Sequence, residues 1–221
     1  MPLNLPKAPT SYLITSGETT ANSTPASEDF QKILALITAA VAARVSLVQL
    51  REKNLSARTL FQLATHAVAI TRGSATRLLV NDRPDIARAA RADGVHLTTR
   101  SLPVDVVRRA FGDELLIGVS THTLGEARAA RDGGADFAVF GPIFETPSKQ
   151  SYGPPVGLEK LIEAVNTLKP FPLIALGGIT HENASTVLRA GVSGVAGIRL
   201  FCDEQAIELT MNALRDQHLS K

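Results

Sequence analysis

The sequence contains a single cysteine, Cys202, among its 221 residues. One thiol can form neither an internal disulfide nor a cysteine zinc site, so nothing in the sequence indicates an oxidising compartment. The sequence also lacks a large net charge, because 23 basic and 21 acidic side chains leave a formal net charge of +2. We therefore expect no nucleic-acid partner, and any anion site must come from a few basic groups placed locally.

Long apolar runs are absent as well. None reaches the length needed to cross a bilayer, and the first residues, MPLNLPKAPTS, lack the apolar segment of a signal peptide. We therefore expect a cytoplasmic protein with no membrane partner. A content of 44% hydrophobic and 20% charged residues is that of an ordinary globular protein, and 221 residues suffice for one barrel domain without requiring a second.

Short runs rich in β-branched residues or leucine alternate along the chain with longer stretches of helical periodicity. This alternation is typical of βαβ units and a parallel sheet. The number of such pairs decides the architecture. Eight runs are candidate strands, at residues 11–15, 45–50, 77–80, 94–97, 115–120, 137–141, 172–176 and 194–198.

Apolar residues recur at helical spacing between these strands, so each helix has one stripe with which to cover a barrel. We predict an α/β fold, a single-domain (β/α)8 TIM barrel over residues 1–221, with an N-terminal extension at 1–10 and a mobile loop at 16–27. An open doubly wound sheet is the alternative, although it often shows a glycine fingerprint where this chain has SGETTANSTPAS. The clearest stripes are Phe30, Ile33, Leu34, Ile37 and Val41; Leu60, Leu63, Ala67 and Ile70; and Leu158, Leu161, Ile162, Val165 and Leu168.

The second candidate strand ends in VQLREK, with Gln49, Arg51 and Lys53 on one face by period-two alternation. The active site of such a barrel lies at the carboxyl ends of its strands. Two cations behind an inward-facing amide therefore predict an anion site at the barrel mouth. A strand end with its charges in water is the alternative.

Asn81 and Asp82 follow the third candidate strand. An amide beside a carboxylate predicts a site for Mg²⁺. A turn is the alternative, in which Asp82 caps the helix that starts near Pro84.

Ser120 and His122 follow the fifth candidate strand, where His122 could exchange protons near neutral pH. A helix cap at Thr121 or Thr123 with a purely structural His122 fits the spacing equally well. His96 lies inside a strand, and we interpret it as a core histidine whose hydrogen bonds are satisfied.

The loop after the sixth strand, GPIFETPSKQSYGPPVG, is long and carries Thr146, Ser148 and Lys149. Such loops often close over substrates, and the two hydroxyls could bind a phosphate, although a surface turn explains them almost as well. The loops after strands seven and eight are the usual phosphate site of this fold. They carry Gly177 and Gly178, whose N–H groups could approach an anion, and Arg199, which could add charge; a tight turn is the alternative.

Six motifs together give the chain a resemblance to the thiamine phosphate synthase and thiazole tautomerase family. They are VQLREK, VND, ADGVHL, GVSTHT, GPIFET and ALGGIT, in the family's order and spacing over nearly the whole chain. The resemblance implies a (β/α)8 barrel that acts in thiamine biosynthesis. Its synthase members are transferases that condense hydroxymethylpyrimidine diphosphate with thiazole phosphate and release pyrophosphate with Mg²⁺; a homo-oligomer is also plausible by resemblance.

The same resemblance assigns roles to residues of this chain. Asp82 matches a Mg²⁺ ligand. The positions that match the pyrimidine and pyrophosphate site are Gln49, Arg51, Lys53, Asn81 and Lys149, and those that match the thiazole phosphate site are Thr146, Ser148, Gly178 and the backbone around Ile198.

Two departures keep other functions open. Ser101, in HLTTRSLP, stands where synthases carry the second acidic Mg²⁺ ligand, and Arg199 replaces a small residue. The segment PIFET also resembles the tautomerase branch, whose members isomerise a thiazole carboxylate phosphate without metal, using a histidine at the position of His122. We favour the synthase, because Gln49, Lys53 and Asp82 are kept; a catalytically silent barrel that binds such phosphates is the third possibility.

Overall fold

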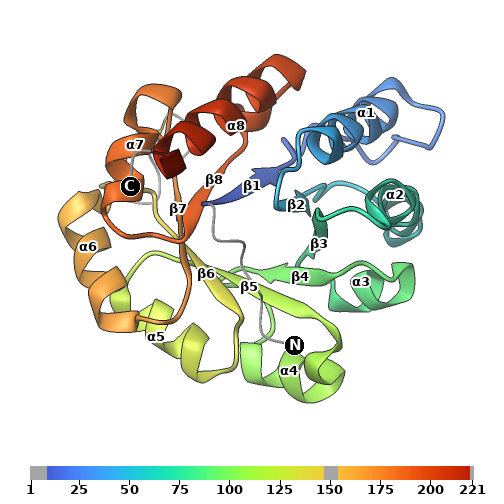
Figure 1. Ribbon diagram of the computed structural model, residues 1–221. Coiled ribbons are helices and arrows are strands. Elements are labelled where there is room, and N and C mark those ends of the chain that lie inside the picture. Colours follow the sequence, from blue (N-terminus) through green and yellow to red (C-terminus); the bar gives the residue numbers. More distant parts are fainter. Residues whose placement is uncertain (1–8, 147–153, 220–221) are drawn as a thin grey trace.

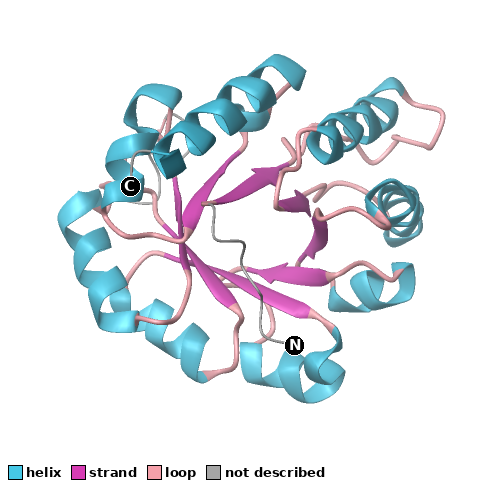
Figure 2. Cartoon of the chain, viewed as in Figure 1, coloured by secondary structure: helices cyan, strands magenta, loops and turns pink. Residues whose placement is uncertain are grey.

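The structure, a computed structural model, describes residues 9–146 and 154–219. Eight parallel strands close into one barrel in sequence order, and β8 pairs with β1. Helices surround the strands on the outside (Figures 1 and 2). The predicted (β/α)8 barrel is therefore confirmed, and the open doubly wound sheet is wrong.

The strands begin and end close to where the sequence pattern places them, and every strand end falls within two residues of the predicted one. The strands are β1 Thr10–Ile14, β2 Leu47–Leu50, β3 Arg77–Asn81, β4 Gly94–Leu97, β5 Leu116–Thr121, β6 Phe137–Phe140, β7 Leu173–Leu176 and β8 Gly194–Gly197. The helices are α1 Glu28–Ala42, α2 Ala57–Thr71, α3 Pro84–Ala90, α4 Val104–Phe111, α5 Leu124–Asp132, α6 Gly157–Leu168, α7 His181–Arg189 and α8 Glu204–Leu219, with the short 3-10 helices η1 Gly112–Glu114 and η3 Arg199–Phe201.

Two apolar layers stabilise the barrel, because alternate residues of a strand face opposite sides. Inside, Tyr12, Leu47 and Phe137 belong to one buried cluster. Outside, Val48 and Leu50 belong to the cluster that the strands share with the helices. The strand β2 therefore supplies both layers, and its alternation sets which polar residues at its end face the barrel interior.

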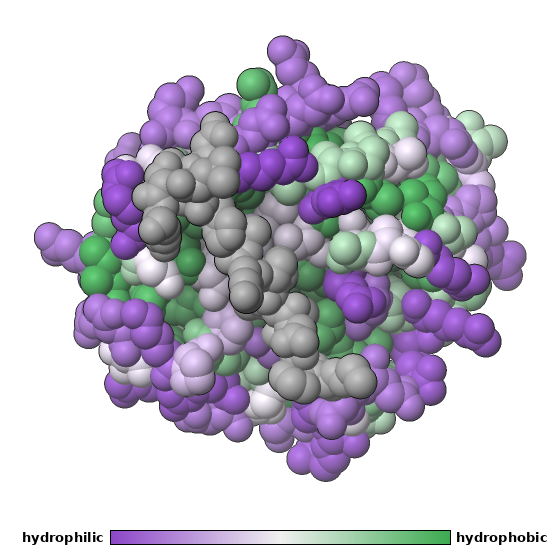
Figure 3. Space-filling model, in the orientation of Figure 1, coloured by the Kyte–Doolittle hydropathy of each residue, from purple (hydrophilic) through white to green (hydrophobic). Residues whose placement is uncertain are grey.

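The helix stripes pack as predicted, with one exception on α6. Leu161 and Leu168 are fully buried, whereas Ile162 is 44% exposed. Successive helical residues are about 100° apart, so the stripe that points Leu161 inward turns its neighbour toward solvent. The prediction that Ile162 belongs to the buried stripe is therefore wrong. Hydrophilic residues project along most of the edge of the face in Figure 3, with hydrophobic residues between them.

None of the helices that the structure describes combines the length and apolar character needed to cross a membrane.

Ile37→Ala and Ile162→Ala form a matched pair that tests this packing. Ile37 on α1 is fully buried, so we expect its truncation to lower the free energy of unfolding by roughly 2–5 kcal/mol. Truncation of the half-exposed Ile162 should change it by no more than about 0.5 kcal/mol. Urea unfolding of both variants measures the difference, and equal losses would contradict the orientation of these helices.

Candidate active site at the barrel mouth

Two side-chain amides meet at the carboxyl ends of β2 and β3. Gln49 is 2% exposed, and its Nε2 donates to Oδ1 of Asn81 at 2.9 Å. The Oε1 of Gln49 is buried and accepts no hydrogen bond from any described residue. A buried acceptor without a donor costs about 1–3 kcal/mol, so this atom marks a place where a ligand donor would be stabilised.

Cations gather beside these amides. Arg51 is half-buried and Lys53 exposed. The pKa of Lys53 lies below its ordinary value of 10.5, first because packing removes part of its hydration and then because Arg51 and Arg100 repel its charge, while the Asp82 carboxylate opposes the shift. The structure therefore brings the predicted Arg51, Lys53 and Asp82 into one electrostatic neighbourhood.

Arg100 is a member of this neighbourhood that sequence reasoning missed. It lies just after β4, whose carboxyl end is beside that of β3. Its place in TTRS, directly after a candidate strand, was the available signal. With Arg51 and Lys53 it makes three cations, a concentration of positive charge that suits a diphosphate.

Asp82 is exposed and has a left-handed backbone with φ of 58°. Its N–H donates to the carbonyl of His96 at 2.9 Å. The helix α3 is capped by Arg83 with no side-chain hydrogen bond, so the alternative in which Asp82 caps this helix is wrong. Within the described residues its carboxylate makes no hydrogen bond or ion pair, which leaves it available to a cation.

Ser101 closes a tight turn after β4. Its Oγ accepts from the N–H of Thr98 at 2.7 Å, and its own N–H donates to the Thr98 carbonyl at 3.0 Å. Its hydroxyl thus serves local structure. No group of three or more His, Cys, Asp or Glu able to hold a metal occurs in the part of the chain that the structure describes.

Glu52 is a second residue that the sequence interpretation missed. Alternation puts it on the outer face of β2, where it is 3% exposed and accepts from the hydroxyls of Thr15 at 2.5 Å and Thr19 at 2.6 Å. Asn54 adds a hydrogen bond from its Nδ2 to the carbonyl of Thr19 at 3.0 Å. The first part of the 16–27 loop is therefore anchored to the end of β2; that the loop is mobile stays a prediction.

Ser120 and His96 face each other across β4 and β5. The Oγ of Ser120 lies 2.9 Å from Nε2 of His96. The Nδ1 of His96 lies 3.1 Å from the hydroxyl of Tyr12, and the ring is 2% exposed. The interpretation of His96 as a satisfied core histidine is confirmed.

His122 turns toward the loop after β6, because its Nδ1 lies 2.5 Å from the carbonyl of Gly141. That contact requires a proton on Nδ1 and leaves Nε2 as the basic nitrogen. Of the two predicted caps, Thr123 is confirmed, since its hydroxyl accepts from the N–H of Glu126. Thr121 is not a cap; it is buried and donates to the carbonyl of Val139.

The glycine pair after β7 makes a turn that other residues could not fit. Gly177 and Gly178 have φ of 101° and 65°. A Cβ on Gly178 would come within 2.6 Å of the Cβ of Phe144, whose N–H donates to Gly177. The loop after β6 therefore lies against this turn. Thr146 is in that loop, with a buried hydroxyl that has no partner among the described residues.

The other predicted phosphate ligands are only partly described. Ile198 is half-buried after β8, and Arg199 is exposed at the start of η3, with no hydrogen bond or ion pair to the described residues. Ser148 and Lys149 lie outside the residues that the structure describes.

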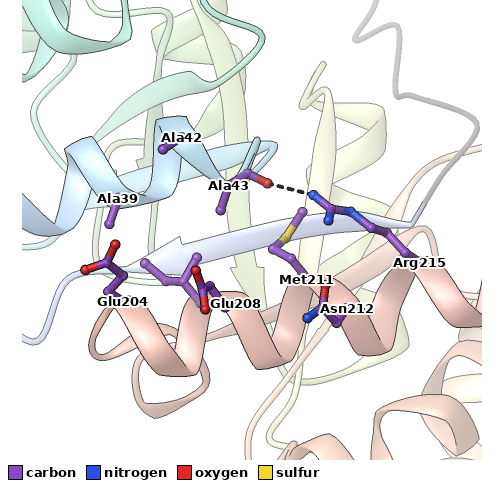
Figure 4. A pocket seen from close by; sticks show the side chains of 9 residues that line it. Ala39, Ala42, Ala43, Glu204, Glu208, Met211, Asn212 and Arg215 are labelled. Carbon is purple, nitrogen blue, oxygen red and sulfur yellow. Dashed lines mark hydrogen bonds between the residues drawn. The ribbon is translucent and has the colours of Figure 1, made fainter.

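A cavity of about 380 Å³ lies away from the mouth, between α1 and α8 (Figure 4). Its lining includes Ala39, Ala42, Glu204 and Glu208. Among the described residues of the lining, the basic one is Arg215, which donates to the carbonyl of Ala43 at 3.3 Å. Two carboxylates and an engaged guanidinium do not suit a phosphorylated ligand, so the mouth is the better candidate site.

Comparison with known sequences shows the family of this chain. A family model described as thiamine monophosphate synthase matches residues 20–201. A relative from Geobacter sulfurreducens is 49% identical over 164 residues, which make up 74% of this chain and 76% of the relative. The thiamine-phosphate synthase of Moorella thermoacetica is 39% identical over 183 residues, or 83% of this chain and 87% of that protein.

A solved structure shares the whole architecture. It is a thiamine phosphate pyrophosphorylase from Pyrococcus furiosus, with a TM-score of 0.80 and 28% identity, covering 94% of this chain and 96% of that one. Residues 20–201, which the family model matches, include both the cationic strand ends and the glycine turn. The chain therefore belongs to the thiamine monophosphate synthase family.

Proposed function

We propose that the protein is a thiamine-phosphate synthase, which joins hydroxymethylpyrimidine diphosphate to thiazole phosphate and yields thiamine phosphate and pyrophosphate. The observation that carries this proposal is the buried Oε1 of Gln49, which has no partner among the described residues and lies on the strand face that continues to Arg51 and Lys53. An acceptor beside two cations suits a ligand with a donor at one end and a diphosphate at the other. The pyrimidine substrate has an amino group and a diphosphate in that relation.

The amide pair would orient the pyrimidine ring. The Nε2 of Gln49 is held by Asn81, so its Oε1 has a fixed direction before the substrate arrives. An acceptor that is already oriented costs no reorganisation on binding. The amino group of the pyrimidine would donate to it.

The cations would act on the leaving group. As the bond from the pyrimidine methylene carbon to oxygen breaks, the electron pair stays on the diphosphate, and the thiazole nitrogen supplies the pair for the new carbon–nitrogen bond. Negative charge on the diphosphate therefore grows in the transition state. The three cations, Arg51, Lys53 and Arg100, would stabilise the charge of the transition state more than that of the bound substrate. Such a difference lowers the activation barrier and accelerates the reaction.

The residues present fit a Mg²⁺ that takes one ligand from the protein and others from the diphosphate of the substrate. Asp82 offers one carboxylate that has no partner among the described residues, whereas Ser101 has no carboxylate to offer. Mg²⁺ commonly takes one or two carboxylates and completes its shell with phosphate oxygens and water. Asp82 would hold the ion, which would neutralise charge on the diphosphate.

The glycine turn would bind the phosphate of the thiazole. The tight packing of Gly178 on Phe144 brings the backbone of this turn against the loop that carries Thr146, whose buried hydroxyl has no described partner. Backbone N–H groups and a hydroxyl together suit a phosphate monoester. The exposed Arg199 would add charge, and Ser148 and Lys149 remain predicted ligands.

A thiazole tautomerase is the second candidate. One observation favours it: His122 carries its proton on Nδ1, which leaves a basic Nε2 with no described partner. Such a base could move a proton on a thiazole carboxylate phosphate without metal.

The test is to incubate the purified chain with hydroxymethylpyrimidine diphosphate, thiazole phosphate and Mg²⁺, with and without chelator. We expect thiamine phosphate and pyrophosphate in equal amounts, lost with chelator and restored by excess Mg²⁺. Gln49→Leu should raise the KM of the pyrimidine substrate about tenfold. Gln62→Leu, on the exposed face of α2, is the control and should leave it unchanged. Failure to form thiamine phosphate, together with metal-free isomerisation of the thiazole carboxylate phosphate, would establish the tautomerase instead.

The lowered pKa of Lys53 predicts a pH dependence. As the pH rises through this pKa, the ammonium loses its charge, so the KM for the pyrimidine diphosphate should rise at a lower pH than an ordinary lysine with pKa 10.5 would allow. Lys53→Arg stays charged, so its KM should remain flat over this range. Lys160→Arg, at an exposed position on α6, should keep the rise of the unmodified chain. If the KM of Lys53→Arg rose with pH as it does in the unmodified chain, a group other than Lys53 would be titrating, and the prediction would be wrong.

A further inference from the structure

Three polar side chains form a chain of hydrogen bonds inside the barrel. The hydroxyl of Tyr12 on β1 lies 3.1 Å from Nδ1 of His96 on β4, and Nε2 of His96 lies 2.9 Å from Oγ of Ser120 on β5. Tyr12 is fully buried and His96 is 2% exposed, whereas Ser120 is half-buried at the carboxyl end of its strand. The chain of contacts therefore runs from the closed interior to the barrel mouth.

Packing fixes the two rings of this chain. The ring of Phe137 lies 5.8 Å from the Tyr12 ring in an edge-on arrangement and 6.3 Å from the His96 ring. Gly118 makes room for them, since a Cβ there would come within 2.9 Å of Nδ1 of His96 and 2.3 Å of the Phe137 ring. The imidazole has little freedom to rotate away from its two partners.

Burial also keeps the imidazole neutral, because loss of hydration lowers the pKa of His96 to about 3. A neutral ring has one N–H donor and one acceptor nitrogen. If Nδ1 carried the proton, Tyr12 would accept it, and the buried O–H of Tyr12 would have no acceptor among the described residues. If Nε2 carries the proton, Tyr12 donates to Nδ1 and Ser120 accepts from Nε2, so that the polar hydrogens of Tyr12 and His96 are both paired. Folded proteins avoid the first arrangement.

The second arrangement decides what Ser120 offers to a ligand. Its oxygen already accepts from His96, and its own O–H has no acceptor among the described residues. Ser120 therefore presents a donor at the mouth. An acceptor atom of a ligand placed there, such as an unprotonated ring nitrogen or a phosphate oxygen, would pair this O–H.

We propose that Tyr12 and His96 are positioning residues, which hold the Ser120 hydroxyl as a donor to an acceptor atom of the pyrimidine diphosphate. Neither residue contacts the ligand; both act through Ser120. The identity of the ligand rests on the proposed function, whereas the direction of the hydrogen bonds does not. The two parts are therefore tested separately.

The direction of the hydrogen bonds is measured by ¹⁵N NMR of the histidine-labelled full chain, with the His96 signals assigned by their loss in His96→Asn. We expect the Nε2–H tautomer, unchanged between about pH 5 and 8, where an ordinary histidine titrates. Tyr12→Phe should add Nδ1–H tautomer to the mixture. An Nδ1–H tautomer in the unmodified chain, or titration of His96 in this range, would overturn the proposal whether or not the chain is a synthase.

The action through Ser120 is measured by a double-mutant cycle on kcat/KM for the pyrimidine diphosphate. Tyr12→Phe should lower it about five- to tenfold in the unmodified chain and hardly at all in Ser120→Ala. Ile174→Val, in the same interior cluster, is the control and should have the same effect in both backgrounds. An equal loss from Tyr12→Phe in both backgrounds would assign Tyr12 a merely structural role. If the unmodified chain forms no thiamine phosphate, the proposed function fails. The NMR measurement of the His96 tautomer still tests the direction of the hydrogen bonds from Tyr12 to Ser120.

Discussion

Closing eight parallel strands into a barrel forces every second side chain of each strand into a confined interior. Apolar residues such as Leu47, Leu79 and Ile174 fill most of that space. Polar groups enter it near the carboxyl ends, where each must find a partner or leave a hydrogen-bonding atom unsatisfied. Gln49, Asn81, His96 and Ser120 satisfy most of this demand among themselves. The buried Oε1 of Gln49 has no partner among the described residues, and it lies at the carboxyl end of β2, where a ligand would bind.

The same alternation gives β2 a double role. Residues that continue its inner face end in the cations of the mouth, while Glu52 on its outer face anchors the neighbouring loop through Thr15 and Thr19. Arg51 also lies against this loop, since its Nη1 donates to the carbonyl of Ser16 at 3.5 Å. One short strand thus positions the amide that would bind the pyrimidine, the charges that would bind the diphosphate, and the loop beside them. The positive charge of Arg51 and the negative charge of the adjacent Glu52 are therefore kept apart, because their side chains point to opposite faces of the strand.

Much of this could be predicted from the sequence, because the periodicities of strands and helices are physical consequences of backbone geometry. All eight strands, the buried His96 and the helix cap at Thr123 follow from local patterns. Contacts between distant residues could not be predicted in the same way. The role of Glu52 depends on a loop more than thirty residues away, and that of Arg100 on the adjacency of two strand ends. The prediction for Ile162 was wrong for a local reason. An apolar residue at the edge of a helical stripe fits the spacing whether its side chain is buried or exposed.

A crystal structure with hydroxymethylpyrimidine diphosphate and Mg²⁺ bound would test the central claim most directly. The account predicts the pyrimidine amino group on Oε1 of Gln49 and the diphosphate among Arg51, Lys53 and Arg100, with the metal on Asp82. A diphosphate bound at the glycine turn of Gly177 and Gly178, with the Gln49 oxygen still unpaired, would contradict it.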